Sequence, residues 1–432
     1  MQQPPFAAGT KLAPYWWDRV PRPHIPPTAL PSRADVVVIG SGYTGLAAAL
    51  QTARGGRDTV VLDAGDAGFG CSTRNGGQVS TSVKPDFATL ARRHGAARAA
   101  AILQDGRASL DWLAGFVAEE EIDCDFRRVG RFHAAHTPAH YAALARALEA
   151  TPRAHAVEAH LVPRAEQHAE IGTDAYHGGV VYPRHASVDP ARLHQGMLDR
   201  ALAAGVRVFA HCPATALASD GGGLRVQTAQ GVVAARQVLV ATNGYTGRLV
   251  PWLRRRVIPI GSYIIATEEL PRGVMARLIP RNRILSDTRR VVYYYRASPD
   301  GRRILFGGRV SHAEIDPRIS APLLKAELVR LFPELADVGI SHSWGGLVAY
   351  TFDTLAHIGR HDGIFHAMGY CGSGVGMAGY LGMRVGQTML GRPEGATGFD
   401  GLRFQTRPFY RGTPWFLGAA VAYHRWRDAR GG

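Results

Sequence analysis

The sequence predicts an α/β (α+β) fold in which two domains are interleaved along the chain. An apolar strand pattern at 36–39 runs into a glycine turn and a small-residue helix pattern. A helix-and-strand unit at 188–241 and a strand–glycine loop–helix pattern at 363–390 add further α/β pieces. Between them, residues 257–310 are rich in β-branched and aromatic side chains with turn signals. We therefore expect one discontinuous α/β domain, interrupted by a β-rich domain.

The first glycine turn has the spacing of a dinucleotide-binding motif, Gly40-Ser41-Gly42-Tyr43-Thr44-Gly45. The first glycine of such a motif suits the tight turn, the second lets a pyrophosphate approach the main chain, and the third lets the helix pack on the strand. The helix N-terminus adds free N–H groups and the positive end of the helix dipole. The turn therefore predicts a Rossmann-like domain.

A second apolar strand, 59–62, ends at Asp63, where a carboxylate could accept the ribose hydroxyls of a dinucleotide. This context separates the motif from a chance glycine pattern in a chain with 51 glycines. A glycine-rich strand–helix turn without a ligand is the alternative.

The composition is typical of a globular chain with a large core, since 46% of its 432 residues are hydrophobic. No apolar run reaches the length of a transmembrane helix, and residues 1–32 read as a proline-rich arm rather than a signal peptide. The four cysteines are scattered, so we expect reduced thiols, no metal site and a cytoplasmic location.

The formal charge of +15 does not indicate nucleic-acid binding. Lysine occurs only at positions 11, 84 and 325, and the densest basic run, 254–256, is short. No nucleic-acid module is visible, so the arginine excess is better explained as a general compositional bias.

Several segments together carry a resemblance to a known family: 34–50, 60–78, 121–126, 241–247, 293–296, 305–310 and 369–376. With these motifs the chain resembles the flavin amine and amino-acid oxidoreductases of the D-amino acid oxidase and glycine oxidase superfamily. Within it, the chain is similar to the gamma-glutamylputrescine oxidoreductase group. The resemblance implies FAD rather than NAD, bound by a Rossmann-like FAD-binding domain of the GR2 type.

The resemblance also implies the cofactor-binding residues. Asp63 stands where the family usually has Glu, and residues 74–78 would run along the isoalloxazine ring. The loop at 372–376 would place a helix N-terminus near the pyrimidine end of the flavin. The full set is Gly40, Ser41, Gly42, Tyr43, Thr44, Gly45, Asp63, Ala64, Ser72, Thr73, Arg74, Asn75, Gly76, Gly77, Gln78, Ala214, Thr242, Asn243, Gly372, Ser373, Gly374, Val375 and Gly376.

The domain boundaries follow from the same pattern. The FAD-binding domain is expected at 33–95, 150–250 and 345–395, and the substrate domain at 96–149 and 251–344. Residues 396–432 are expected to form a C-terminal packing segment.

The implied reaction is the oxidation of a C–N bond in a secondary or N-substituted amine, a polyamine derivative or an amino acid. A hydride passes from the carbon beside nitrogen to flavin N5, and the imine hydrolyses in water. We expect Arg74, Tyr294 and Arg309 to be catalytic, and the substrate face to be drawn from Tyr263, Tyr293, Tyr295, Trp344 and Tyr350. Because alternate residues of a strand point to opposite faces, only one set of the tyrosines at 293–295 can face the flavin. Core packing is the alternative for each aromatic, and a solvated strand end is the alternative for Arg309.

Three departures from the family pattern refine this prediction. Val348 stands where glycine oxidase-like members carry a carboxylate-binding arginine, which argues against a simple α-amino acid. No cysteine occurs at 344–353, so we expect non-covalent FAD. Residues 304–306 lack the lysine that promotes reaction with oxygen in the sarcosine oxidase branch, and Lys84 is the only lysine near the flavin loop. His342 and His366 are weaker candidates for stabilising charge.

Two alternatives to an amine oxidase stay open. One is a dehydrogenase that passes electrons to a quinone or carrier protein rather than O2, suggested by the basic charge and the aromatic segment at 409–426. The other, from a different class, is a flavin-binding module without turnover. We expect small-molecule partners, no nucleic acid and no transmembrane segment.

Overall fold

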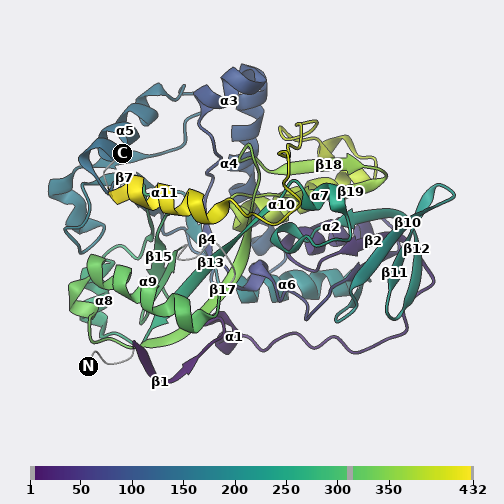
Figure 1. Cartoon of the computed structure of the whole chain (residues 1–432), viewed down its shortest axis with the longest axis horizontal. Coiled ribbons are helices and arrows are strands. Elements are labelled where there is room, and N and C mark those ends of the chain that lie inside the picture. Colours follow the sequence, from purple (N-terminus) through teal and green to yellow (C-terminus); the bar gives the residue numbers. More distant parts are fainter. Residues whose placement is uncertain (1–4, 309–314, 430–432) are drawn as a thin grey trace.

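The computed structural model describes residues 5–308 and 315–429. Within them, two large sheets lie beside each other, an eight-stranded sheet at the right of Figure 1 and a nine-stranded sheet at the left. The predicted Arg309 falls between the two described ranges, so its role stays a sequence-based prediction.

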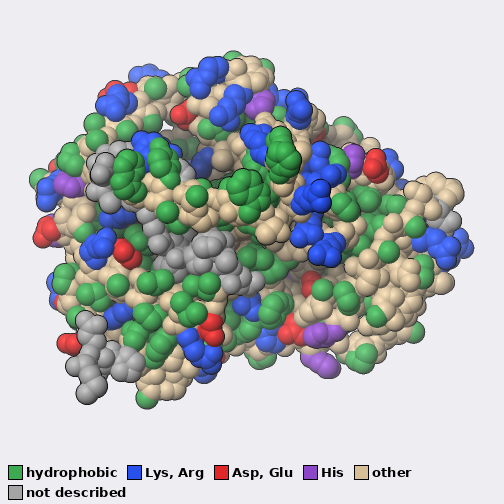
Figure 2. All heavy atoms as spheres, viewed as in Figure 1, with side chains coloured by type: hydrophobic (Ala, Val, Ile, Leu, Met, Phe, Trp, Pro, Cys, Tyr) green, Lys and Arg blue, Asp and Glu red, His purple; other side chains and the backbone are tan. Residues whose placement is uncertain are grey.

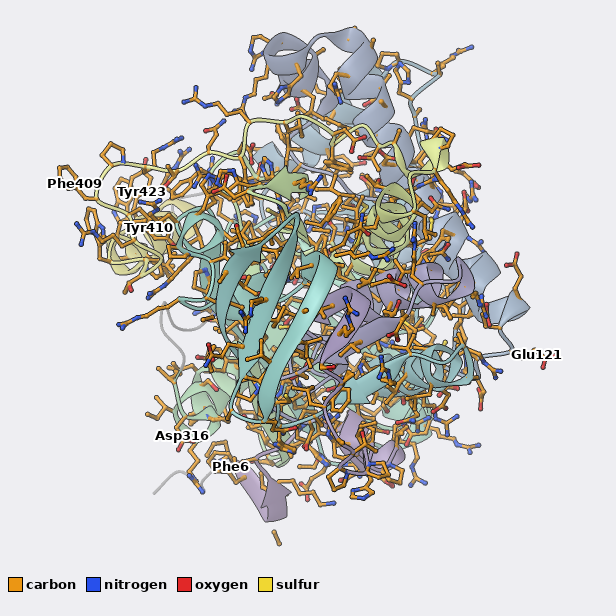
Figure 3. All side chains as sticks on the ribbon, turned by 90° about the vertical axis from the view of Figure 1, so that its right-hand side faces the viewer. Phe6, Glu121, Asp316, Phe409, Tyr410 and Tyr423 are labelled. Carbon is orange, nitrogen blue, oxygen red and sulfur yellow. The ribbon has the colours of Figure 1, made fainter. Side chains whose placement is uncertain are left out.

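The eight-stranded sheet has a parallel centre. Strands β12 (Gly231–Val240), β2 (Arg33–Ile39), β3 (Thr59–Leu62) and β9 (Arg207–Phe209) pair in that order and run parallel. The strand β19 (Ile364–Met368) pairs in parallel with the other side of β12 and antiparallel with β18 (His357–His361). Strands β10 (Ala214–Asp220) and β11 (Gly223–Thr228) continue β12 as an antiparallel ribbon, seen in front in Figure 3.

Four helices cover one face of this sheet, and a mixed layer that includes α7 covers the other. Val36 and Val38 of β2 join a core with α2 (Tyr43–Arg54), α4 (Ala96–Glu119), α6 (Pro190–Ala203) and α10 (Gly374–Met389). Val37 and Ile39 join a second core that includes residues of α7 (Pro251–Arg254). Burial on both faces explains why β2 is a continuous apolar run rather than an alternating one.

The glycine turn after β2 has the geometry that its sequence predicts. Gly40 adopts φ +108°, which an L side chain rarely tolerates. A Cβ on Gly45 would lie 1.9 Å from the carbonyl oxygen of Gly40, so only glycine allows α2 to start so close to the strand.

The nine-stranded sheet gathers strands from distant parts of the chain. In spatial order they are β1 (Phe6–Lys11), β17 (Ile340–Tyr350), β13 (Ile258–Thr267), β16 (Ile304–Gly308), β15 (Tyr294–Ala297), β14 (Ile284–Asp287), β5 (Arg131–Ala134), β7 (Gly179–Tyr182) and β6 (His160–Val162). One face packs in a core with α8 (Arg272–Leu278) and α9 (Pro317–Leu331). The opposite face meets the glycine loop at 74–77, as described below.

The sheet pairing differs from the expected domain boundaries at two places. Strands β6 and β7 lie in the range assigned to the FAD-binding domain, yet they belong to the nine-stranded sheet. Residues 345–350 of β17 also belong to that sheet. The sequence could not place these short strands, because their partners lie far away along the chain.

The apolar periodicity of residues 88–121 predicts a single helix, but the structure has two helices there. They are α3 (Phe87–His94) and α4, joined at Gly95 with φ +83°. Further elements are α5 (Pro138–Ala150), α11 (Leu417–Ala429) and the small ribbon of β4 (Gln78–Val79) with β8 (Ala186–Ser187). Among the described residues, no helix is long and apolar enough to cross a membrane.

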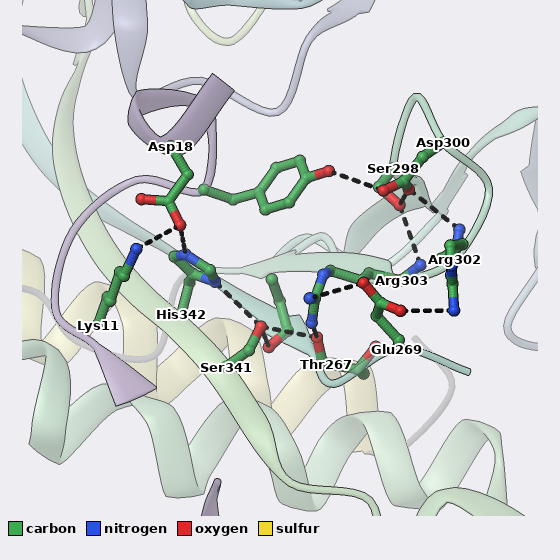
Figure 4. A network of polar contacts seen from close by, with 12 residues as sticks. Lys11, Asp18, Thr267, Glu269, Ser298, Asp300, Arg302, Arg303, Ser341 and His342 are labelled. Carbon is green, nitrogen blue, oxygen red and sulfur yellow. Dashed lines mark hydrogen bonds and ion pairs between the residues drawn. The ribbon is translucent and has the colours of Figure 1, made fainter. Parts of the chain in front are cut away.

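The N-terminal arm packs on the molecule through β1 and α1 (Trp16–Arg19). Asp18 accepts hydrogen bonds from Lys11 Nζ at 2.7 Å and from His342 Nε2 at 3.0 Å, which ties the arm to β17 (Figure 4). Desolvation lowers the pKa of His342, against the opposing effect of its bond to Asp18. His342 therefore anchors the arm in this network.

Candidate active site

A cavity of about 380 Å³ opens at the carboxyl end of the parallel strands. The last residues of β2, β3 and β12 line it, and this is the edge at which open α/β sheets bind ligands. Ten of the residues expected to bind the cofactor line this cavity: Gly40, Gly42, Tyr43, Thr44, Asp63, Ala64, Ser72, Ala214, Thr242 and Asn243.

Asp63 is held in place by the glycine turn. Its Oδ2 accepts hydrogen bonds from the Ser41 N–H at 2.8 Å and the Ser41 hydroxyl at 2.6 Å, and its Oδ1 accepts from the Gly65 N–H at 3.0 Å. A carboxylate oxygen can accept two hydrogen bonds, so Oδ1 keeps one acceptor position. The carboxylate is therefore fixed in position and can still accept a hydrogen bond from a ribose hydroxyl.

Ser72 sits at the N-terminus of α2. Its Oγ accepts from the Tyr43 N–H at 3.0 Å, and a Cβ on Gly42 would lie only 2.8 Å from this oxygen. The space at Gly42 is therefore needed by the protein itself as well as by a ligand.

His194 of α6 is a residue that the sequence analysis missed. Its Nε2 donates to the carbonyl oxygen of Ser41 at 2.8 Å, and its ring fills the space beside Gly68. Desolvation lowers its pKa to about 4, so the imidazole is neutral at pH 7. A histidine within a helix carries no motif, and only the fold brings it beneath the turn.

The loop at 71–77 is closed by its own hydrogen bonds. Asn75 Nδ2 donates to the carbonyl oxygens of Cys71 and Ser72, and Asn75 Oδ1 accepts from the Gly77 N–H at 2.8 Å. Gly77 has φ +64°, and a Cβ there would lie 2.2 Å from the Val188 carbonyl oxygen. The expected flavin loop is thus preorganised.

Two tryptophans of the N-terminal arm hold the same loop. Trp16 Nε1 donates to the Asn75 carbonyl oxygen at 2.8 Å, and Trp17 Nε1 donates to Thr73 Oγ1 at 3.0 Å. The arm therefore fixes the loop that is expected to bind the flavin.

The second expected flavin loop precedes α10. Gly372 adopts φ +98°, and Ser373 occupies the N-cap position of the helix. Ser373 Oγ donates to the Ser82 carbonyl oxygen at 2.7 Å, and the hydroxyl of Tyr350 lies 3.4 Å from where a Cβ of Gly372 would be. The structure thus brings Tyr350 to this loop.

Tyr294 and Trp344 share the sheet face that meets the loop at 74–77. The Tyr294 ring lies against Gly76, 3.1 Å from the position of an added Cβ, and its hydroxyl lies 2.8 Å from Ser262 Oγ. Trp344 Nε1 donates to the Arg74 carbonyl oxygen at 2.8 Å. Two residues lie between them in the sheet. Ile264 pairs with Trp344 on one side and with Gly307 on the other, and Gly307 in turn pairs with Tyr294.

Arg74 points along the loop rather than away from it. Its Nε donates to the Phe69 carbonyl oxygen at 2.7 Å and its Nη1 to the Gly345 carbonyl oxygen at 3.1 Å. The guanidinium lies 4.2 Å from the Phe69 ring centre and 4.8 Å from that of Trp17.

The expectation that Tyr263, Tyr293 and Tyr295 line the substrate face finds no support in their placement. All three are buried in the core on the opposite face, with α9. The Tyr263 hydroxyl accepts from the Ile315 N–H at 2.6 Å, and the Tyr295 hydroxyl donates to that of Tyr176 at 3.1 Å. The alternation of the strand selects Tyr294 for the loop side and leaves its neighbours to the core.

Cys71 lies next to residues 344–353, the segment in which the sequence has no cysteine. Its thiol donates to the Leu347 carbonyl oxygen, with Sγ 2.8 Å from that oxygen, and it lines the 380 Å³ cavity. A thiol is therefore present beside residues 344–353 at the cavity, although those residues include no cysteine. Non-covalent attachment of FAD stays a prediction.

A partly buried polar cluster on the loop-side face was also missed. It consists of Arg131 and His133 of β5, Ser286 of β14, and Ser82 and His185 nearby. Arginine and histidine at i and i+2 of a strand point to one face, but no motif marks them.

Comparisons with known proteins identify the family of this chain. Residues 35–388 match the model of the DAO family, described as FAD dependent oxidoreductase. The chain is 32% identical over 422 residues to a probable oxidoreductase OrdL of Rhizobium meliloti (strain 1021), covering 94% of this chain and 95% of that protein. It is also 32% identical over 406 residues to gamma-glutamylputrescine oxidoreductase of Escherichia coli (strain K12), covering 92% and 93%.

Among solved structures, glycine oxidase from Geobacillus kaustophilus superposes with a TM-score of 0.75 at 20% sequence identity. The match covers 88% of this chain and 99% of that one. At this identity the likeness concerns the fold alone.

Proposed function

The chain belongs to the DAO family of FAD-dependent oxidoreductases, and from this premise we propose that it oxidises the C–N bond of an amine. The substrate class is a secondary or N-substituted amine, a polyamine derivative or an amino acid. One relative is named as an oxidoreductase of gamma-glutamylputrescine, and a solved neighbour is a glycine oxidase.

The residues of the cavity fit FAD. The adenosine and pyrophosphate portion would lie between the glycine turn, Asp63 and Ala214, where Gly42 leaves the backbone open and Asp63 keeps an acceptor position. The flavin end would lie between the loops at 74–77 and 372–376. Backbone glycines at both loops allow a flat ring to approach closely.

When bound, FAD supplies the electron acceptor for a hydride from the carbon beside nitrogen. The protein's part is to bind the amine in an uncharged form, orient it and exclude water. Tyr294 lies against Gly76 and is the candidate to contact the amine, whereas Ile264 and Trp344 pack beneath it in a core with Tyr15 and Trp16 of the arm. The Tyr294 hydroxyl is bonded to Ser262 Oγ, and the Arg74 guanidinium donates to the Gly345 carbonyl oxygen of β17.

One observation carries the proposal: the contact between Tyr294 and Gly76. It joins the β-rich face expected to bind substrate to the loop expected to bind the flavin. A substrate in contact with Tyr294 would therefore lie beside the isoalloxazine ring of the flavin, which is the arrangement that hydride transfer requires.

The electron acceptor is proposed to be O2 or a carrier. Residues 304–306 are buried and apolar, so they provide no cation for oxygen activation. A carrier-linked dehydrogenase is favoured by the C-terminal segment, where Phe409 is 89% and Trp415 71% exposed. Hydrophobic and basic side chains are interspersed on the face of Figure 2, and Phe409 and Tyr423 lie at the edge of the molecule in Figure 3.

Anaerobic reduction of the holoenzyme tests the proposal. The purified protein is mixed with a panel of polyamines, acylated polyamines, secondary amines and amino acids, and the visible flavin band is followed. Bleaching by one class supports the proposal, and hydrogen peroxide after admission of air identifies O2 as the acceptor. No bleaching by any member would favour a flavin-binding module without turnover.

A further inference from the structure

We propose that the C-terminal segment binds the surface of a membrane that contains anionic lipids. The binding face consists of Phe409 and Trp415, which precede α11, and of Tyr423 and Trp426 within it, and we call it the C-terminal aromatic face. This inference goes beyond the oxidation of an amine, because it concerns where the protein is held and not the reaction at the flavin.

The four aromatic side chains of this face lie at the protein surface. Phe409 is 89% exposed, Trp415 71%, Tyr423 53% and Trp426 49%. Phe409 and Tyr423 project from the same edge of the molecule in Figure 3. Single exposed apolar residues are common on proteins, but four large rings within one short segment are typical of a surface that binds a partner or a membrane.

Phe409 has a backbone conformation that L side chains rarely adopt, with φ +61°. Its neighbour Tyr410 is buried, and the Tyr410 hydroxyl donates to the Val257 carbonyl oxygen at 2.6 Å. The turn therefore directs Tyr410 inward and Phe409 outward. Within the chain, the Phe409 ring gains almost no burial that would offset this unfavourable conformation, whereas insertion into an apolar medium would supply it.

An aromatic cluster beneath the loop holds it on the protein. The Phe352 ring contacts the rings of Tyr410 and Phe416, with centroids 5.2 and 6.4 Å away. Trp415 packs edge-on against Phe416, with centroids 5.7 Å apart. Phe409 and Trp415 are therefore presented from a fixed base and not from a free tail.

The helix α11 has two different faces. Leu417 and Val421, one turn apart, pack in a cluster with residues of β13. The exposed positions repeat at i, i+3, i+4 and i+7: Ala419, Ala422, Tyr423 and Trp426. This spacing places them together on one side of the helix. The helix therefore packs on the protein with one side and presents small and aromatic side chains on the other.

The segment that carries the C-terminal aromatic face is positively charged. No aspartate or glutamate occurs from residue 401 to residue 427, and Arg403, Arg407 and Arg411 are exposed. The Arg254 side chain packs against Gly412, which brings the basic run at 254–256 to the same loop. Among the described residues, none of these four arginines forms an ion pair. The face is therefore complementary to an anionic surface.

The chemistry of the face favours a bilayer over a protein. Aromatic rings bordered by arginines are the composition of segments that lie in the headgroup region of a membrane. A bilayer adapts its shape to rings that project separately, whereas a protein partner must provide a pocket for each. A second copy of the chain would bring two basic faces together, which is unfavourable. We therefore assign the face to an anionic lipid surface.

Vesicle binding by the purified holoenzyme tests the proposal. The protein is sedimented with vesicles of phosphatidylcholine alone, or of phosphatidylcholine and phosphatidylglycerol in equal amounts, at low and at raised salt. We expect at least about tenfold tighter binding to the mixed vesicles, and weaker binding at raised salt because the arginine charges are screened. The visible flavin spectrum verifies that each protein is folded and contains FAD.

Two double variants identify the residues that bind. Phe409→Asn with Trp415→Ser removes both rings, and asparagine is chosen at 409 because it tolerates positive φ. This variant should bind the mixed vesicles at least about tenfold more weakly. Arg407→Gln with Arg411→Gln should lose about fivefold in affinity for each charge and should depend less on salt.

Matched controls come from regions away from the C-terminal aromatic face. The ribbon of β11 and β12 lies in front in Figure 3, where Phe409 is at the edge. Arg225→Gln with Arg236→Gln removes the same charge from exposed positions of this ribbon. Leu202→Ser with Val232→Ser removes exposed apolar side chains from α6 and β12. Both controls should bind within about twofold of the wild type.

Three results would overturn the proposal: no binding to the mixed vesicles, undiminished binding by F409N/W415S, or equal losses in the arginine variant and its ribbon control. If the wild type binds no vesicle, binding to polyglutamate that both variants weaken would assign the face to an acidic protein. Self-association in sedimentation velocity that F409N/W415S abolishes would assign it to a second copy. Because no amine is present, none of these results depends on the proposed oxidation.

Discussion

The carboxylate of Asp63 accepts two hydrogen bonds from Ser41, one from the backbone N–H at 2.8 Å and one from the hydroxyl at 2.6 Å. This relationship joins the end of β3 to the glycine turn after β2, two elements that are neighbours in the sheet. The residue expected to hold the ribose therefore also fixes the turn expected to hold the pyrophosphate.

We expect Asp63→Ala to weaken FAD binding about 10- to 100-fold, since hydrogen bonds to a charged group contribute about 1.5–3 kcal/mol. Fluorescence titration of the apoprotein with FAD measures the effect, with circular dichroism to verify the fold. Ser41→Ala keeps the carboxylate and should cause a smaller loss. Unchanged affinity in Asp63→Ala would mean that the ribose binds elsewhere.

Gly42→Val should abolish FAD binding, because the added side chain occupies the pyrophosphate approach. It would also collide with Ser72 Oγ, 2.8 Å from the new Cβ. The double variant with Ser72→Ala separates the two effects. Recovery of flavin content in the double variant would assign the defect to Ser72 and not to the cofactor.

Replacement of Arg74 by Met should slow flavin reduction more than it weakens FAD binding, because Arg74 lies where the loop meets Trp344 and Gly345. The control is Arg22→Met, whose guanidinium also lies over Trp17, at 4.5 Å, but donates to the Ala67 carbonyl oxygen. Anaerobic stopped-flow kinetics compare the two. Equal reduction rates in Arg74→Met and wild type would exclude a catalytic role.

Acid should destabilise the apoprotein below about pH 6.5. Burial lowers the pKa of His194 to about 4 and that of His185 to about 3, whereas the unfolded residues titrate near 6.5. The unfolded chain therefore takes up these protons first, and stability is lost as pH falls from about 6.5 toward about 4. Urea unfolding at several pH values measures the slope, which His194→Gln should reduce. An identical slope in the variant would contradict a buried neutral His194.

Denaturation in trichloroacetic acid should release all the flavin into the supernatant, as expected for non-covalent FAD. Cys71 makes this a real test, because it lines the cavity beside Leu347. Flavin retained by the precipitated wild type but released from Cys71→Ser would show a covalent bond to this cysteine.

The sequence predicted the elements whose signals are local. The strand at 36–39, its glycine turn and the helix after it form as expected because each residue's role depends on near neighbours. The alternation of residues 293–295 also predicted correctly that their tyrosines divide between the two faces of the sheet. The sequence could not show which of the two faces meets the loop, because this contact depends on Gly76, more than two hundred positions earlier.

The parts that escaped prediction depend on pairing between distant strands. Arg131 meets Ser286 only because β5 pairs with β14, and Cys71 meets Leu347 only through the packing of the loop on β17. His194 and His185 likewise have no local pattern. A single sequence contains the residues of these contacts but not the register that brings them together.

The most direct test of the central claim is anaerobic mixing of the purified holoenzyme with the panel of amines and amino acids while the visible flavin band is recorded. We predict that one class bleaches the band with saturating dependence on its concentration, as expected for an FAD-dependent amine oxidoreductase. A flavin band that no member of the panel bleaches would contradict the proposed oxidation of a C–N bond.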